Sequence, residues 1–179
     1  MRLSTQRLIL EPLAVAHAEK LYRGLSDPTL YKFIPADPLS LDALTERYRR
    51  IVRGPRDNHI ELWRNWAVRL GNAGGVDGDN EGYIGIIETS IFPSDYAYLA
   101  YFMFASHQRQ GYANEACAAV LAHIRETYAI KRIVAEMDVR NIASWRLVES
   151  LGFIRIGNKL NADFFKGESS DEYLYELTF

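Results

Sequence analysis

The sequence predicts an α+β protein in which helices cover both faces of a mixed β-sheet. Residues 96–104 contain no charge, glycine or proline, which is typical of a central strand covered on both faces. A short polar loop containing Gly111 leads from this strand into an amphipathic helix, and residues 132–139 form the next strand. This order of strand, helix and strand predicts a right-handed crossover between two parallel strands.

One strand and two helices are predicted in the N-terminal part of the chain. We predict a strand at residues 7–12 and a helix at residues 14–25 that ends before Pro28, because proline disfavours helical backbone in the residue before it. Ser40 is a suitable N-cap for a second helix at residues 41–52, since its hydroxyl can accept a hydrogen bond from the first turn.

Two further strands, at residues 62–70 and 83–91, lead to the central strand. Between them, residues 72–82 are rich in glycine, which predicts a hairpin loop. The acidic residues of this loop miss the spacing of an EF-hand, so we expect no metal site.

The helix after Gly111 is predicted to bury one apolar face against the sheet. That face consists of Ala116, Cys117, Val120, Leu121 and Ile124. The spacing repeats with the period of an α-helix, so the segment is expected to pack over the sheet.

The last elements are a helix and two strands. Asn141 caps a helix that runs to Ser150, with Gly152 as its C-cap, the residue types preferred at these positions. The strands are expected to pair antiparallel across a loop. Their ranges are 153–160 and 172–179, and the loop between them is 161–170.

Composition limits the function classes. The 179 residues, 48% hydrophobic and 25% charged, fit one soluble globular domain. A net charge of −2 gives no broad attraction to nucleic acid or an anionic membrane. The only cysteine, Cys117, excludes an intrachain disulfide and is expected to be buried and inert. With no signal segment or membrane span in view, we expect a cytoplasmic enzyme and leave open a homodimer.

The loop around Gly111 has the features of a phosphate cradle. First-turn N–H groups of a helix lack internal partners and carry partial positive charge, Gly111 lets an anion approach the backbone, and Arg109 adds a formal charge. A plain strand-to-helix turn is the alternative. The loop is neither a P-loop nor a dinucleotide fingerprint, because the lysine and the additional glycines of those motifs are missing.

A second group of polar residues lies about 30 residues further on. Ser144 shares a predicted helix face with Leu147, Val148 and Leu151, so its hydroxyl either bonds the helix backbone or points into a cavity. Asn141 is fully explained by capping. The residues alone favour these structural roles.

Together these motifs resemble the GNAT N-acetyltransferase superfamily. Gln108-x-x-Gly111-x-Ala113 is similar to its acyl-CoA pyrophosphate loop, and Asn141-x-x-Ser144 followed by Gly152-Phe153 is similar to its second motif. The start of the chain, residues 3–10, resembles the branch that acetylates N-termini of ribosomal proteins. The resemblance implies a mostly antiparallel sheet of about seven strands with a V-shaped split, and acetyl-CoA as co-substrate.

The resemblance also assigns residues to the site. The cofactor-binding residues implied are Met103, Phe104, Gln108, Arg109, Gln110, Gly111, Tyr112, Ala113, Asn141 and Ser144. The implied reaction is direct attack of a primary amine on acetyl-CoA, with backbone N–H groups near Met103 and Phe104 polarising the thioester. Many relatives carry a tyrosine at the position of Val148, so here either Ser144 assists the leaving thiolate or water does.

The general base is harder to assign. Glu88 is predicted to share a strand face with Ile84 and Ile86, where burial would raise its pKa and suit it to act on an ammonium through water or by binding it. A salt bridge or a solvated strand end is the alternative. Arg47, with Arg49 and Arg50, is expected on a solvated helix face or as a guide for anions. Tyr31, Tyr98 and Tyr101 are interpreted as core or pocket wall.

Three functions are consistent with the sequence. The leading hypothesis is acetylation of a protein N-terminal α-amine, whose pKa of about 7.7–8.0 demands less help from a base than a lysine at about 10.4. The second is acetylation of a small amine such as a polyamine, amino acid or aminoglycoside. The third is a non-catalytic domain that binds acyl-CoA.

Overall fold

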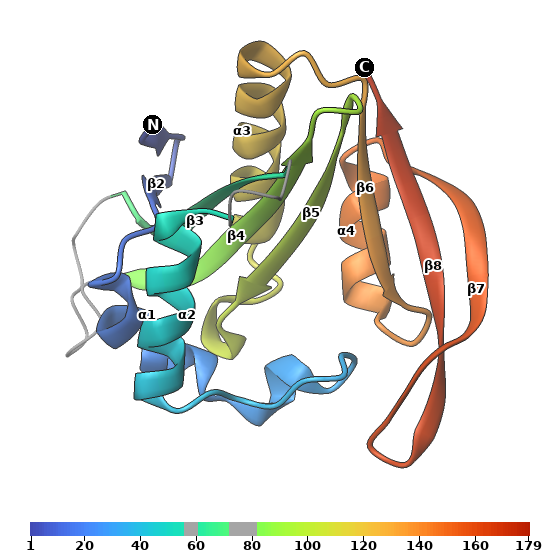
Figure 1. Cartoon of the computed structure of the whole chain (residues 1–179), viewed down its shortest axis with the longest axis horizontal. Coiled ribbons are helices and arrows are strands. Elements are labelled where there is room, and N and C mark those ends of the chain that lie inside the picture. Colours follow the sequence, from blue (N-terminus) through green and yellow to red (C-terminus); the bar gives the residue numbers. More distant parts are fainter. Residues whose placement is uncertain (56–60, 72–81) are drawn as a thin grey trace.

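The computed structural model describes residues 1–55, 61–71 and 82–179. Within these residues it contains one sheet of eight strands in the order β1-β2-β3-β4-β5-β6-β8-β7 (Figure 1). The strands are β1 (Leu3–Ser4), β2 (Leu8–Pro12), β3 (Leu62–Leu70), β4 (Tyr83–Phe92), β5 (Tyr96–Met103), β6 (Arg132–Asp138), β7 (Ile154–Phe165) and β8 (Glu168–Thr178). The helices are α1 (His17–Leu25), α2 (Leu41–Arg53), α3 (Tyr112–Thr127) and α4 (Ile142–Ser150), with 3-10 turns η1 (Pro28–Tyr31) and η3 (Ala105–His107).

The predicted mixed sheet is confirmed, and so is its split. All the neighbouring strands pair antiparallel except β5 and β6, which are joined through α3. Their parallel pairing extends only from Tyr96–Arg132 to Tyr98–Val134. Beyond this point the two strands diverge into a V, visible between β5 and β6 in Figure 1.

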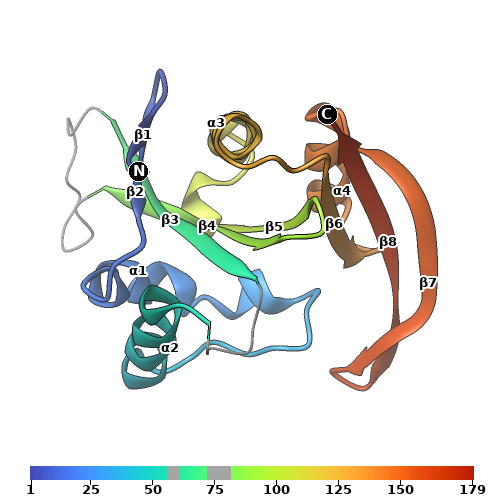
Figure 2. The same ribbon diagram turned by 45° about the horizontal axis from the view of Figure 1, so that its top comes forward.

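Helices cover the two faces of the sheet, as predicted. Figure 2 shows α1 and α2 below the strands β2–β5 and α3 above them. One apolar core lies on the side of α3 and α4 and a second on the side of α1 and α2. The five predicted apolar residues of α3, from Ala116 to Ile124, are all buried. None of the described helices is long and apolar enough to cross a membrane.

Local capping explains where several elements begin. The Ser40 hydroxyl accepts from the N–H of Ala43 at 3.2 Å, and the Asn141 side chain accepts from the N–H of Ser144, also at 3.2 Å. Both predicted N-caps are therefore confirmed. The glycine-rich segment predicted as a hairpin loop lies, apart from Gly82, outside the described residues.

The C-terminal hairpin is longer than predicted. Most of residues 161–170, expected to be a loop, continues β7 and β8 to a tight turn at Lys166 and Gly167. Both turn residues have positive φ, 51° and 81°, the backbone that a two-residue hairpin turn requires. The prediction failed because asparagine, aspartate and glycine here have low strand propensity, and register shifts in β7 absorb them.

The middle of the central strand β5 is covered on only one face, which corrects a second prediction, although Phe102 near its end packs against the second core. Ala97 and Leu99 are buried on the α3 side, whereas Tyr98, 38% exposed, and Ala100 face the other side and remain accessible. Its apolar run resembled a doubly covered strand, but α1 and α2 do not extend over this part of the sheet (Figure 2). The middle of the sheet thus has an open patch.

A β-bulge alters the expected face of Glu88. The register of β3 against β4 shifts between Val68 and Arg69, so that Ile84 joins the α3-side core while Ile86 joins the α1-side core. Glu88 therefore shares a face with Ile86 and not with Ile84. Glu88 faces α2, whereas the bulge moves Ile84 to the opposite face.

Candidate active site

The loop before α3 has the shape of an anion cradle. Arg109 and Gly111 both adopt left-handed backbone, with φ of 60° and 81°, and no side chain caps the N-terminus of this 16-residue helix. Its first-turn N–H groups are thus available to an anion. A Cβ on Gly111 would lie 3.2 Å from the Arg7 guanidinium, so a larger residue would fill the cradle.

The two glutamines of the loop hold its shape. Gln108 donates to the carbonyl oxygen of Met103 at 3.0 Å, and Gln110 donates to that of Ser106 at 2.9 Å. Arg109 is exposed beside them. The predicted cradle residues are therefore brought together, with Arg109 as the charged one and the glutamines as braces.

Arg7 is a cation of the cradle that the sequence analysis missed. Its guanidinium donates to the carbonyl oxygen of Gln110 at 3.0 Å, lies 4.6 Å from the ring centre of Tyr112 and pairs with Glu115 at 2.6 Å. Burial works to raise the pKa of Glu115, but hydrogen bonds from Thr5 and Arg7 outweigh it and the pKa is lowered. Because 108 residues separate the partners, no local pattern could indicate this contact.

At the edge of β5 inside the V, backbone N–H groups have no backbone partner among the residues that the structure describes. Gly85 of β4 lies opposite Met103 of β5, and the next residue, Phe104, donates its N–H to the carbonyl oxygen of Ile84 at 2.8 Å. Because successive N–H groups of a strand point to opposite sides, those of Met103 and Tyr101 point away from β4 and toward the V. The Phe104 N–H is occupied, which removes it as a donor for a thioester, and its ring is buried beneath α1. The N–H of Tyr101 is the second one on this edge that points toward the V.

Ser144 lies on the first turn of α4, facing β5 across the V. Its hydroxyl is 2.8 Å from the hydroxyl of Tyr101, and its N–H is held by Asn141. The side chain thus bonds another side chain instead of its own helix. Val148, where many relatives have tyrosine, is fully buried and offers no proton.

Glu88 is paired with Arg47, which the sequence analysis placed on a solvated face or as a guide for anions. One guanidinium nitrogen, Nη2, lies 2.8 Å and 3.0 Å from the two carboxylate oxygens. The Arg47 side chain is 39% exposed and that of Glu88 is 18% exposed, so solvent screens the charges of the pair only in part. The salt bridge that was the alternative interpretation of Glu88 is therefore present, while Arg49 pairs with Glu46 at the surface.

Tyr48 and Tyr31 lie close enough to this ion pair for its charges to act on the pKa of their hydroxyls. Burial, reinforced by Glu88, raises the pKa of Tyr48 far above its usual value, and burial likewise raises the pKa of Tyr31. The Tyr48 hydroxyl is buried and has no hydrogen-bond partner among the described residues. An unsatisfied buried donor of this kind is rare and indicates a site where a ligand or water can bind.

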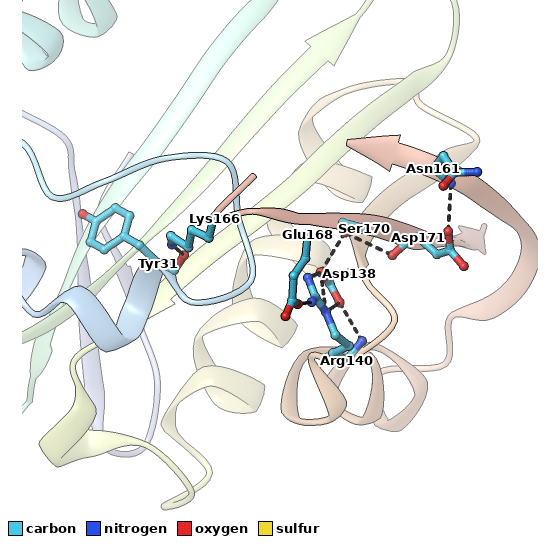
Figure 3. Close-up of polar contacts among 8 residues, drawn as sticks. All are labelled: Tyr31, Asp138, Arg140, Asn161, Lys166, Glu168, Ser170 and Asp171. Carbon is cyan, nitrogen blue, oxygen red and sulfur yellow. Dashed lines mark hydrogen bonds and ion pairs between the residues drawn. The ribbon is translucent and has the colours of Figure 1, made fainter. Parts of the chain in front are cut away.

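The C-terminal hairpin borders the open patch from the other side. Lys166 at its tip donates to the carbonyl oxygen of Tyr31 in η1 (Figure 3). Close to this tip, Glu168 at the start of β8 pairs with Arg140 at 2.5 Å, and Arg140 also pairs with Asp138 at 2.6 Å. These contacts, labelled in Figure 3, fix the hairpin relative to both arms of the sheet.

The two candidate catalytic side chains meet the same short stretch of β5 from opposite faces. Glu88 pairs in register with Ala100, and Ser144 bonds the next residue, Tyr101. Both residues lie just beyond the last pairing of β5 with β6. An acyl group held at this strand edge would have a carboxylate on one side and a hydroxyl on the other.

An anion-binding helix start beside an open strand edge is the combination that an acyl-transferring enzyme needs for a phosphate-bearing donor. Residues 7–154 match the family described as acetyltransferase (GNAT) domain. The chain belongs to this family and is an acetyltransferase. The predicted recognition is thereby confirmed.

Individual relatives share the whole length of the chain. An uncharacterized N-acetyltransferase YnaD of Bacillus subtilis (strain 168) is 26% identical over 184 residues, covering 99% of this chain and 96% of the relative. RimL, a ribosomal L7/L12 alpha-N-protein acetyltransferase in complex with coenzyme A, has a TM-score of 0.85 at 17% identity, covering 100% and 98%. A ribosomal-protein-S5-alanine acetyltransferase from Vibrio fischeri has a TM-score of 0.81 at 18% identity, covering 99% and 96%.

The residues present fit coenzyme A. The cradle of Arg7, Arg109 and Gly111 would hold the pyrophosphate, and the V edge would hold the acyl end. Next to Ser144, the indole N–H of Trp145 is buried without a partner among the described residues, as expected of a donor that a bound amide satisfies. Among the described residues no group of three or more His, Cys, Asp or Glu is placed to hold a metal.

Proposed function

We propose that this acetyltransferase uses acetyl-CoA to acetylate the N-terminal α-amine of a protein or peptide. The observation that carries the proposal is the convergence of Glu88 and Ser144 on Ala100 and Tyr101, with Ala100 exposed on the Glu88 side. The acyl end of the donor lies at the V edge of β5, and the amine reaches the thioester from the open patch. Amine attack forms the amide bond as the carbon–sulfur bond breaks.

The charge of the patch favours a peptide N-terminus over a polyamine. Glu88 attracts an ammonium group, but Arg47 compensates its charge at 2.8 Å, so the patch does not concentrate several cations. The Arg47 side chain, 39% exposed, can donate to the carbonyl oxygen that follows an α-amine in a peptide. A polyamine has no such acceptor.

The proton of the amine needs a modest acceptor. Because an α-amine has a pKa of about 7.7–8.0, a sizeable share is neutral at physiological pH, and Glu88 has only to hold the ammonium and pass its proton to water. The names of the ribosomal-protein acetyltransferases RimL and the Vibrio fischeri enzyme support the same substrate class.

Thiol release from acetyl-CoA, measured with a panel of acceptors, tests the proposal. The panel contains a peptide with a free N-terminus, the same peptide blocked at its N-terminus but carrying an internal lysine, a polyamine, a free amino acid and an aminoglycoside. We expect turnover with the first peptide and none with the blocked one, with mass spectrometry placing the acetyl group on the α-nitrogen. Preferential turnover of a small amine would overturn the assignment of the acceptor.

A further inference from the structure

The Tyr101 hydroxyl links the two arms of the split sheet, β5 and the segment from β6 to α4, at a point where their backbones have separated. Tyr101 extends from β5 toward α4 and places its hydroxyl 2.8 Å from the hydroxyl and 3.1 Å from the carbonyl oxygen of Ser144. The last backbone pairing between the arms is three residues earlier, at Tyr98. Tyr101 therefore fixes Ser144 relative to the strand edge that receives the acyl group.

Proton counting shows what this contact can do. The two hydroxyls carry one proton each, and the Ser144 carbonyl oxygen can only accept. If Tyr101 donates to the carbonyl oxygen, the Ser144 proton points to Tyr101. If Tyr101 donates to the Ser144 hydroxyl, the Ser144 proton is free for a third group. A negative charge arriving beside Ser144 favours the second arrangement, and a hydroxyl that accepts a hydrogen bond is itself a stronger donor.

Tyr101 is suited to orient a proton and not to release it. Burial raises its pKa well above the usual value, so the phenol stays neutral. The neighbouring N–H of Ser144 is held by Asn141 at 3.2 Å, which fixes the first turn of α4. With these two contacts, rotation of the Ser144 hydroxyl is the main remaining freedom.

We propose that Tyr101 is a positioning residue that aims the Ser144 hydroxyl at the sulfur of the departing coenzyme A. The inference rests on the proposed acetyl transfer. As the carbon–sulfur bond breaks, its electron pair stays on sulfur, Ser144 donates a hydrogen bond to the thiolate, and Tyr101 donates to Ser144. Neither hydroxyl loses its proton, and the thiolate is protonated later by solvent.

A double-mutant cycle tests the coupling. Tyr101→Phe should lower kcat about fivefold, the effect of one neutral hydrogen bond, with little change in the KM for acetyl-CoA. In a Ser144→Ala background the same change should have no further effect, because the hydroxyl that it positions is absent. Equal losses in both backgrounds would show that Tyr101 acts independently of Ser144 and overturn the proposal.

A matched control separates positioning from stability. Tyr175 is also buried and donates its hydroxyl to α4, at Glu149 and 2.8 Å, at the end of the helix remote from Ser144. Tyr175→Phe should lower thermal stability about as much as Tyr101→Phe while leaving kcat unchanged. Equal losses of kcat in the two variants would assign Tyr101 a structural role.

A binding readout does not depend on turnover. The thiol pKa of enzyme-bound coenzyme A, followed by the ultraviolet absorbance of the thiolate, should be lower in the wild type than in Tyr101→Phe or Ser144→Ala, which should agree with each other. Identical values in all three proteins would overturn the proposal. If no acceptor is acetylated but the titration differs as expected, the proposed reaction fails while the positioning of Ser144 stands.

Discussion

The two faces of β5 are built in different ways. On the α3 side, Leu99 and Met103 are each 5% exposed and pack under a helix that follows the strand directly in the chain. On the other side, Ala100 is open, and its surroundings come from distant segments, with α2 providing Arg47 and the C-terminal hairpin contacting η1. The closed face holds the V edge and the start of α3 in place for a donor that is the same in every turnover, and the open face fits the variable substrate.

The largest test of this contrast acts on the closed face. Gly111→Trp should weaken coenzyme A binding about 100-fold or more, because the indole would fill the cradle and block the charge-assisted hydrogen bonds of the helix start. Calorimetry measures the affinity, and circular dichroism checks the fold. Gly54→Trp is the matched control, since Gly54 also has positive φ, 88°, with nothing within 4 Å of a Cβ. Unchanged affinity in the first variant would remove the cradle.

The next test concerns the carboxylate of the open face. Glu88→Gln keeps size and hydrogen bonding but removes the charge, so kcat/KM for the acceptor should fall about 100-fold at low pH. The loss should shrink toward pH ~9, where the amine is already neutral. A pH–rate profile decides between roles, because an equal loss at every pH would mean that Glu88 only holds the substrate.

A substitution of Arg47 on the open face should change which acceptor is preferred more than it changes the overall rate. Arg47→Gln leaves Glu88 uncompensated, so turnover of a polyamine relative to a peptide should rise about tenfold, roughly 1.4 kcal/mol. Arg49→Gln is the control, because Arg49 lies on the same helix in an exposed pair with Glu46. A ratio that moves equally in both variants would mean that general surface charge sets the preference.

The smallest effect concerns Glu11 on β2, whose carboxylate accepts hydrogen bonds from Arg69 on β3 and Tyr83 on β4. Burial works to raise the pKa of Glu11, but hydrogen bonds from Arg69 and Tyr83 outweigh it and lower the pKa from 4.5 to about 2. A carboxylate with a depressed pKa stabilises the fold fully above its ordinary pKa, and this contribution is lost as the pH falls toward 2. Glu11→Gln should therefore cost about 1–2 kcal/mol at neutral pH and nothing near pH ~2.

Denaturant unfolding at several pH values measures this difference. Glu46→Gln, which removes an exposed carboxylate 65% accessible in its ion pair, should show almost no cost at any pH. A cost for Glu11→Gln that stays constant down to pH ~2 would mean that the side chain contributes packing and not charge.

The closed face could be predicted from the sequence because its determinants are local. The spacing of Ala116 to Ile124, the Asn141 cap and Gly111 each act within one or two helical turns, and all lie where the pattern placed them. The pairing of Arg47 with Glu88 spans 41 residues and that of Arg7 with Glu115 spans 108. Such contacts depend on the assembled sheet, and the bulge that turned Glu88 away from Ile84 has no signature in one sequence.

The separation of β5 from β6 also has a consequence for amide hydrogen exchange. Ala100 and Phe102 donate their N–H groups to β4, whereas those of Tyr101 and Met103 face the V, where β6 no longer pairs with them. Successive residues of one strand thus alternate between amides bonded within the sheet and amides that rely on whatever enters the split. Protection of the amides from exchange should therefore alternate from residue to residue along this strand. A molecule that occupies the V should raise the protection of Tyr101 and Met103 toward that of Ala100 and Phe102.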